Sequence, residues 1–145
     1  MSQYCTEADL LGEIQPADLV SLTDDSVPPL GIVGEDVLAS TIASSSGIID
    51  RYVGNIYAVP FGDPAPPSVR SLCITITCYK LYRRREVPDE KNKFTEEYRD
   101  AIAFLQAVNK RDATLDLSVS PAVPMVAVDV TPTIFGSGNI PASTR

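Results

Sequence analysis

The sequence contains no histidine, and its cysteines are few and irregularly spaced. Histidine is the commonest general base and the commonest imidazole metal ligand, so its absence excludes a Ser–His–acid triad. The three cysteines, Cys5, Cys73 and Cys78, form neither a CxxC redox pair nor a repeated zinc-binding framework. We therefore expect no metal ion and no cofactor, and thiols packed as small hydrophobic side chains.

Long apolar runs are also missing. No stretch approaches the roughly 20 residues that a transmembrane helix needs. Residues 1–7 have neither the basic start nor the apolar stretch of a signal peptide, so we expect the protein to fold where it is made, without a membrane. The length of 145 residues allows one modest domain with appendages.

Motifs for catalysis are absent as well. No G-x-S-x-G elbow occurs, and Gly136-Ser137-Gly138 matches neither a dinucleotide fingerprint nor a P-loop. The acidic pairs Asp24-Asp25 and Glu35-Asp36 lack the spacing of a calcium loop and are typical of acids that flank helices. A carboxylate pair for glycoside hydrolysis is disfavoured in a small helical domain without pocket-lining aromatic residues. The sequence thus predicts a protein that is not an enzyme.

Charge is present but unevenly distributed. The net charge is −7, yet residues 1–63 carry ten acidic side chains and one basic one, whereas residues 64–112 carry ten basic and seven acidic ones. In a head-to-tail assembly, the acidic face of one copy can contact the basic face of the next. The alternative is a monomer with two solvated surfaces of unequal charge.

Apolar periodicity and capping residues predict a mainly α fold, a small bundle of about four to five helices. Thr6 is a suitable N-cap for a first helix that ends at residues 12–14. The stretch Ser44-Ser45-Ser46-Gly47 is a poor helix former, but its small side chains would let a neighbouring helix approach closely. The other helices are predicted over residues 16–22, 35–53, 68–82 and 94–108, with a loop over 24–35 and a rigid proline-rich connector over 60–67.

The central segment, residues 68–82, has two possible interpretations. Ile74-Thr75-Ile76-Thr77 alternates as in a strand. The whole segment is longer than most strands, however, and Pro67 suits the first turn of a helix. We predict a helix that is apolar nearly all round and forms the buried centre of the domain.

Two features are candidates for contacts with other proteins. The basic run after the central helix either compensates the helix dipole or binds phosphate or an acidic partner; sequence-specific DNA binding is disfavoured by the negative net charge. Residues 118–145 are predicted to form an extended, strand-like C-terminal arm beside the helical domain of residues 1–117. The predicted subunit or partner interface comprises Arg83, Arg84, Arg85, Val126, Val128, Val130, Ile134 and Phe135.

Several short motifs, taken in their order and spacing, resemble a known family. They are Tyr4-Cys5-Thr6 with Asp9-Leu10, Leu19 with Leu22-Thr23-Asp24, Ile49-Asp50-x-Tyr52, Tyr57-x-x-Pro60, Pro66-Pro67, Cys73, Tyr79-x-Leu81-Tyr82-x-Arg84, Tyr98-x-x-Ala101-Ile102-x-Phe104-Leu105 and Leu115-x-Leu117. Over residues 4–117 the chain resembles the Mu-like prophage head–tail connector proteins. That family usually has a glycine shortly before its Leu-x-Leu, whereas residues 109–114 contain none, so we expect a different end to the last helix.

The resemblance implies a structural protein of the virion neck, present in the host cytoplasm before assembly. It implies a head–tail adaptor that forms a ring, twelve-fold in symmetry, between the portal protein and the next neck or tail protein. Packaged DNA would pass through the channel without specific binding, and an acidic N-terminal half near the channel would repel its phosphates. The alternatives are a tail-terminator or head-closure protein, or a non-viral regulatory module that binds acidic partners through residues 83–85.

Overall fold

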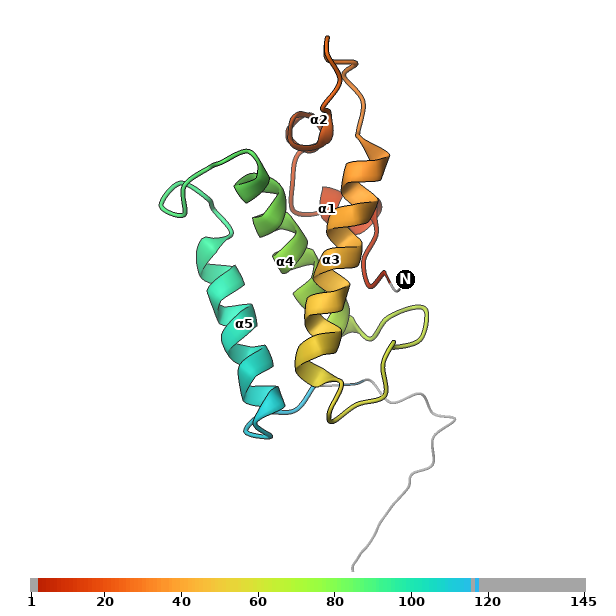
Figure 1. Ribbon diagram of the computed structural model, residues 1–145, viewed down its shortest axis with the longest axis vertical. Helices are drawn as coiled ribbons and strands as arrows, with labels where there is room; N and C mark the ends of the chain where they lie inside the picture. The colour runs from red at the N-terminus through yellow and green to blue at the C-terminus, as the bar shows by residue number, and fades with distance from the viewer. Residues whose placement is uncertain (1–2, 116, 118–145) are drawn as a thin grey trace, which may run out of the picture.

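The computed structural model describes residues 3–115 and 117, and within them the chain forms five α-helices and no strand. This confirms the predicted mainly α fold. The predicted arm, residues 118–145, lies outside the described residues. The helices are α1 (Glu7–Leu11), α2 (Pro16–Thr23), α3 (Glu35–Val53), α4 (Pro67–Arg84) and α5 (Thr95–Asn109) (Figure 1).

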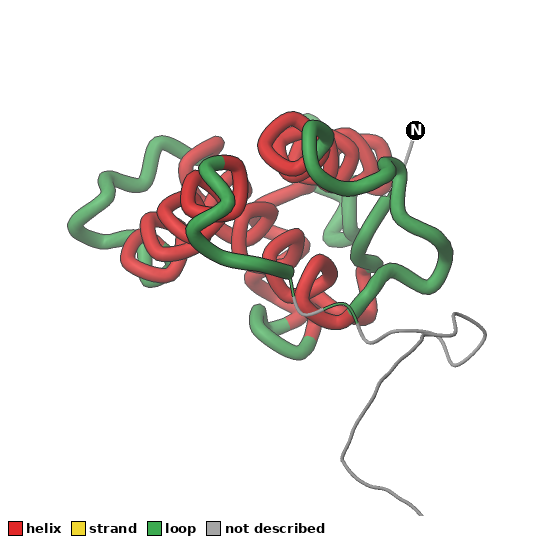
Figure 2. The backbone as a smooth tube through the Cα atoms, turned by 90° about the horizontal axis from the view of Figure 1, so that it is seen from below, coloured by secondary structure: helices red, strands yellow, loops and turns green. Residues whose placement is uncertain are grey.

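Helix α4 is the centre of the bundle, as its apolar sequence predicts. The long helices α3, α4 and α5 pack against one another, while α1 and α2 also contact α4 (Figures 1 and 2). Seven side chains of α4 are buried. They are Val69, Cys73, Ile76, Thr77, Cys78, Tyr79 and Leu81.

The small residues in the middle of α3 face the core on one side only. Ser45 and Ser46 are completely buried, whereas a Cβ added to Gly47 would meet no atom within 4 Å. The Thr77 hydroxyl of α4 donates a hydrogen bond to Ser45 Oγ at 2.9 Å, and Ser45 Oγ donates to the Thr41 carbonyl at 3.0 Å. The two serines, and not the glycine, therefore form the close contact between α3 and α4, with their hydroxyls satisfied.

The segment before α1 is held in place by both backbone and side-chain contacts. Thr6 and Asp9 form a capping box, in which the Thr6 hydroxyl accepts from the Asp9 amide and the Asp9 carboxylate accepts from the Thr6 amide. The buried Tyr4 donates its amide to Ser46 Oγ at 3.1 Å and its hydroxyl to the Asp50 carboxylate. The Tyr4 hydroxyl also accepts from the amide of Phe61, in the α3–α4 connector, at 3.1 Å.

Helices α4 and α5 both end in a Schellman motif without glycine. At the end of α5, the amide of Arg111 donates to the Val108 carbonyl and that of Asp112 to the Ala107 carbonyl, and Arg111 has a left-handed φ of 66°. Glu86 has a φ of 60° at the equivalent position after α4. The backbone after α5 thus adopts the conformation that favours glycine, although residues 109–114 contain none.

A candidate interaction surface

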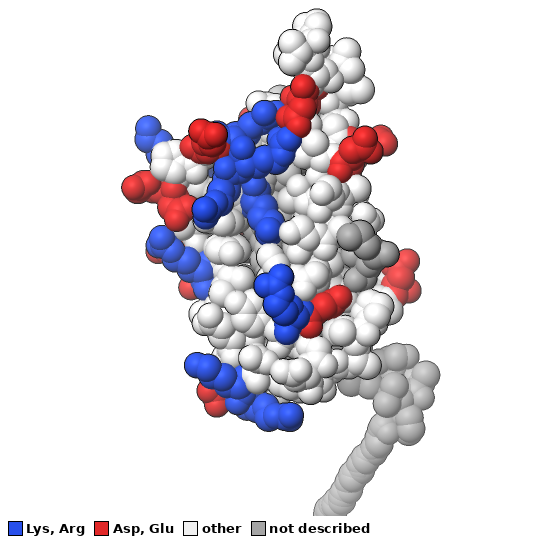
Figure 3. Space-filling view, in the orientation of Figure 1, with Lys and Arg blue, Asp and Glu red and all other residues white. Residues whose placement is uncertain are grey.

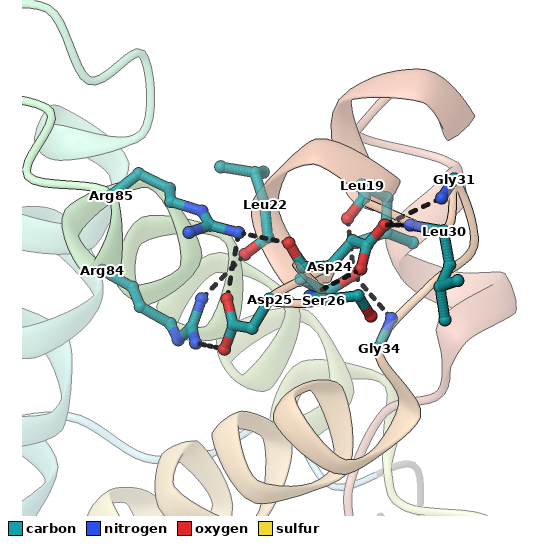
Figure 4. Close-up of polar contacts among 11 residues, drawn as sticks. Leu19, Leu22, Asp24, Asp25, Ser26, Leu30, Gly31, Gly34, Arg84 and Arg85 are labelled. Atoms are coloured by element: carbon teal, nitrogen blue, oxygen red, sulfur yellow. Dashed lines mark hydrogen bonds and ion pairs between the residues drawn. The ribbon is translucent and has the colours of Figure 1, made fainter. Parts of the chain in front are cut away.

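Two of the three predicted interface arginines contact a loop of their own chain. Arg84 forms an ion pair with the Asp25 carboxylate and donates to the Leu22 carbonyl at 3.1 Å. Arg85 forms an ion pair with Asp25 at 3.1 Å and donates to the Asp24 carbonyl at 3.0 Å (Figure 4). These arginines therefore attach the end of α4 to the α2–α3 loop, and Arg84 and Arg85 hold the pKa of Asp25 below its usual range.

The other basic side chains at the end of α4 have no such partner. Arg83 donates to the Tyr79 hydroxyl at 3.2 Å, and Lys80 donates to the Ser44 hydroxyl at 3.1 Å. Among the described residues, no carboxylate lies within ion-pair distance of either cation. Burial lowers the pKa of Lys80, and the nearby charges of Arg51 and Arg83 lower it further. This crowding of like charges favours binding of an anion.

A hollow between α3 and α4 brings these cations together. Its volume is about 440 Å³, and hydroxyls from α3 form its other wall. Figure 3 shows Lys and Arg side chains clustered on this face, over the C-terminal part of α4. We call it the basic hollow; its described lining contains no carboxylate and consists of Ser40, Thr41, Ser44, Lys80, Arg83 and Arg84.

The α2–α3 loop is a preformed structure. The Asp24 carboxylate accepts the amides of Ser26 at 3.0 Å and of Leu30 and Gly31, each at 2.8 Å (Figure 4). These hydrogen bonds hold the pKa of Asp24 below its usual range. The Thr23 hydroxyl accepts the Gly34 amide at 2.9 Å, and any Cβ on Gly34 would overlap the Thr23 carbonyl oxygen. Asp24 and Thr23 thus fix both ends of the loop.

The outer part of this loop is apolar and exposed. Val27 is 96% exposed, Leu30 66% and Ile32 61%, and the loop projects beyond α2 and α3 at one end of the molecule (Figure 1). We call these three residues the apolar tip. Proline and glycine signals predicted a loop here, but these three residues were missed as a candidate contact site. The signal was the apolar residues interspersed among Pro28, Pro29 and Gly31, where loops usually carry polar residues.

Acidic side chains on α1, α2 and the turn between them are exposed. Glu7, Glu13 and Asp18 form no ion pair with any described residue. Glu35 and Asp36, in the first turn of α3, instead line a separate hollow of about 640 Å³ under the chain's own α2–α3 loop. We call Glu7, Glu13 and Asp18 the acidic segment.

The remaining predicted interface residues, Val126, Val128, Val130, Ile134 and Phe135, lie outside the described residues. Within the described part of the chain, no group of three or more Cys, Asp or Glu side chains is arranged to hold a metal ion. None of the described helices combines the length and apolarity needed to cross a membrane.

Exposed apolar side chains that lie together, as in the apolar tip, are a feature that marks candidate contact sites on protein surfaces. The family model of bacteriophage Mu Gp36 matches residues 4–129. The chain belongs to this family and is a Mu-like phage protein, which confirms the phage origin that the sequence motifs indicate. The match continues past residue 117 and includes Val126 and Val128 of the predicted arm. No curated protein matches the sequence.

Proposed function

We propose that this protein is a head–tail adaptor whose copies form a ring between the portal and the next neck or tail protein. The observation that carries the proposal is the presence, on separate elements, of charges of opposite sign that form no ion pair with any described residue. The basic hollow lies between α3 and α4, whereas the acidic segment lies on α1, α2 and their connection. Membership of a Mu phage family supports a structural role in the particle.

The two charged surfaces suit a contact between unlike faces of identical copies. Such a heterologous contact closes into a ring when the rotation between copies divides a full turn evenly. Charge complementarity then sets the register, because like-charged faces repel one another. In this arrangement Lys80 and Arg83 of one copy bind carboxylates of the acidic segment of the next copy.

The proposal also covers location, chemistry and partners. The protein is a component of the virion neck, is present in the host cytoplasm before assembly, and has no catalytic activity, cofactor or membrane contact. Its net charge of −7 disfavours attachment to DNA phosphates, so packaged DNA can slide through a ring of twelve-fold symmetry. Acidic residues of the N-terminal half near the channel would strengthen this repulsion.

Electron microscopy of the full chain tests the proposal. The purified protein is imaged in negative stain alone, with portal-bearing heads, and with heads that lack the portal as the control. We expect rings at the portal vertex and heads that then accept tails. A monomer that ignores portal-bearing heads would overturn the adaptor role. Binding only to finished tails, or only after another neck protein, would instead indicate a tail-terminator or a head-closure protein.

The contribution of residues 118–145 is tested by deletion. The family match includes the first part of this segment, and its apolar residues were predicted to contact neighbouring copies. We expect the shortened chain to retain its helical circular dichroism signal while forming fewer rings. Normal ring formation by the shortened chain would exclude this segment from the contact between copies.

A further inference from the structure

Two thiols from distant parts of the sequence meet in the core. Cys5 lies just before α1 and Cys73 lies in α4, and their sulfur atoms are 3.2 Å apart. Both side chains are buried, with exposed fractions of 2% and 0%. The third cysteine, Cys78, is also buried but makes no contact of this kind with another described thiol.

The surroundings of the pair favour a thiolate on Cys73. Its sulfur contacts the Cys5 thiol, lies 3.6 Å from Ser46 Oγ and lies 3.9 Å from Thr77 Oγ1. The hydrogen bond from Cys5 lowers the pKa of Cys73, and the same contact raises the pKa of Cys5. Burial raises the pKa of Cys78 to about 12, which makes this thiol unreactive. Because the two sulfur atoms are in contact, we take Cys73 as the thiol that reacts first and Cys5 as the one that reacts second.

Only the Cys5 side of the pair borders a surface hollow, whereas Cys73 lies behind it with an exposed fraction of 0%. Cys5 lines a surface hollow of about 750 Å³ between the N-terminal segment and the connector, together with Tyr4, Thr6 and Phe61. A disulfide has a sulfur–sulfur distance of about 2.05 Å, so only a small approach of the two side chains is required. The fixed position of Tyr4, through its bonds to Ser46 and Asp50, keeps Cys5 beside Cys73 during the reaction.

We propose that Cys5 and Cys73 form an oxidation site at which a peroxide creates a disulfide between the N-terminal segment and α4. Hydrogen peroxide enters from this hollow past Cys5 and meets the Cys73 thiolate. The thiolate attacks one oxygen, which breaks the O–O bond and gives a sulfenic acid and hydroxide. Cys5 sulfur then attacks the Cys73 sulfur, and the hydroxyl leaves as water. In total, two thiols and one hydrogen peroxide give one disulfide and two waters.

The disulfide has a mechanical consequence. It closes a loop between residues 5 and 73, which restricts the unfolded chain and stabilises the fold. It also makes the attachment of the N-terminal segment covalent, whereas the reduced segment is held by hydrogen bonds and packing. A particle that leaves the reducing cytoplasm would thereby contain a more stable subunit.

To test the proposal, the reduced full chain is treated with hydrogen peroxide and the oxidant is then removed. Free thiols are blocked in denaturant, and the intact mass of the protein is measured. We expect a product lighter by two hydrogen atoms with one free thiol, at Cys78, and a higher unfolding temperature. Cys78→Ser is the matched control and should behave like the parent chain. Cys5→Ser and Cys73→Ser should not form the bond, and circular dichroism verifies that both variants are folded.

Several outcomes would overturn the proposal. One is that all three thiols survive the treatment, and another is that Cys73 accumulates as sulfinic acid while Cys5 stays reduced. A disulfide that includes Cys78, or that links two chains, would also exclude the assigned pair. If a serine variant fails to fold, peptide mapping of the oxidised parent chain still identifies the bonded cysteines directly.

Discussion

At the scale of single residues, the backbone at Arg111 has a conformation that its side chain disfavours. Its φ of 66° places it in the left-handed region, where a side chain costs roughly 1–2 kcal/mol relative to glycine. The conformation persists because the amides of Arg111 and Asp112 bond to carbonyls in the last turn of α5. These hydrogen bonds leave no freedom for Arg111 to relax while α5 ends at Asn109.

Arg111→Gly is therefore expected to stabilise the protein. Glycine relieves the left-handed strain but adds freedom to the unfolded chain, so we expect a net gain of about 0.5–1 kcal/mol. The midpoint of urea unfolding measures the change. Lys110→Gly is the control, because Lys110 has a φ of −86° and should gain nothing from glycine. A higher midpoint for the control than for Arg111→Gly would contradict the explanation.

Asp24 gives a pH-dependent prediction. Its carboxylate accepts three loop amides, so its pKa in the folded state lies below the ordinary value of 3.8. The stabilisation is therefore complete above 3.8 and is lost as the pH falls through the lowered pKa. Asp24→Asn removes an acceptor oxygen and the charge, and should lower the unfolding midpoint at neutral pH. Urea unfolding at a series of pH values should show the difference from the parent chain shrinking in acid; a difference that stays constant would exclude this role.

At the scale of elements, local signals predict the helices well. Thr6, Pro16 and Pro67 mark helix starts. The length of the central segment predicted a helix despite the strand-like alternation of residues 74–77, and the structure confirms that helix. The contacts around the α2–α3 loop could not be predicted in this way. Arg84 and Asp25 are 59 residues apart in the sequence, and no periodic pattern encodes a contact at that separation.

The apolar tip supports a prediction about an element that projects from the bundle. Val27→Ser, Leu30→Ser and Ile32→Ser together should leave folding stability nearly unchanged, since these side chains are already exposed. Because the tip lies at one end of the molecule, we expect it to contact the portal and not the neighbouring copy (Figure 1). Burying such side chains contributes about 1.5–3 kcal/mol each, so the triple variant should bind portal-bearing heads at least tenfold more weakly.

Sedimentation of the variant with portal-bearing heads measures this loss, and negative-stain images of the variant alone measure ring formation. Ala39→Ser and Ala103→Ser, on exposed positions of α3 and α5, form a control that adds polar groups elsewhere. If the triple variant no longer forms rings but still binds heads, the tip contacts the neighbouring copy and not the portal.

At the scale of the whole molecule, folding neutralises part of the charge separation seen in the sequence. Asp25 from the acidic half forms ion pairs with Arg84 and Arg85 from the basic part of the same chain. These three charges are therefore paired within one copy, although the sequence predicted that such charges would pair between copies. Lys80 and Arg83, by contrast, line the basic hollow and form no ion pair with a described residue, so their charges can bind a partner. The sequence shows how much charge each segment carries, but only the fold shows which charges remain for a partner.

The remaining charges allow a test of assembly by charge exchange. In one variant, Lys80→Glu and Arg83→Glu reverse the basic hollow; in the other, Glu7→Lys and Asp18→Lys reverse the acidic segment. Each variant alone should remain monomeric, because both of its contact faces then carry the same sign. Mixed together, the two variants should alternate and form rings again, since every contact joins opposite charges, and a twelve-fold ring accommodates the alternation.

Light scattering and negative-stain images of each variant and of the mixture measure the outcome. The rings of the parent chain should also dissociate as salt is raised, because exposed charges are screened over about 10 Å at 0.1 M ionic strength. Glu96→Lys with Asp100→Lys, on the exposed face of α5, is the control for net charge alone and should leave the rings intact. If neither reversed variant loses its rings, the proposed electrostatic contact between the basic hollow and the acidic segment is wrong. If both lose them and the mixture does not recover, the basic hollow and the acidic segment do not bind each other.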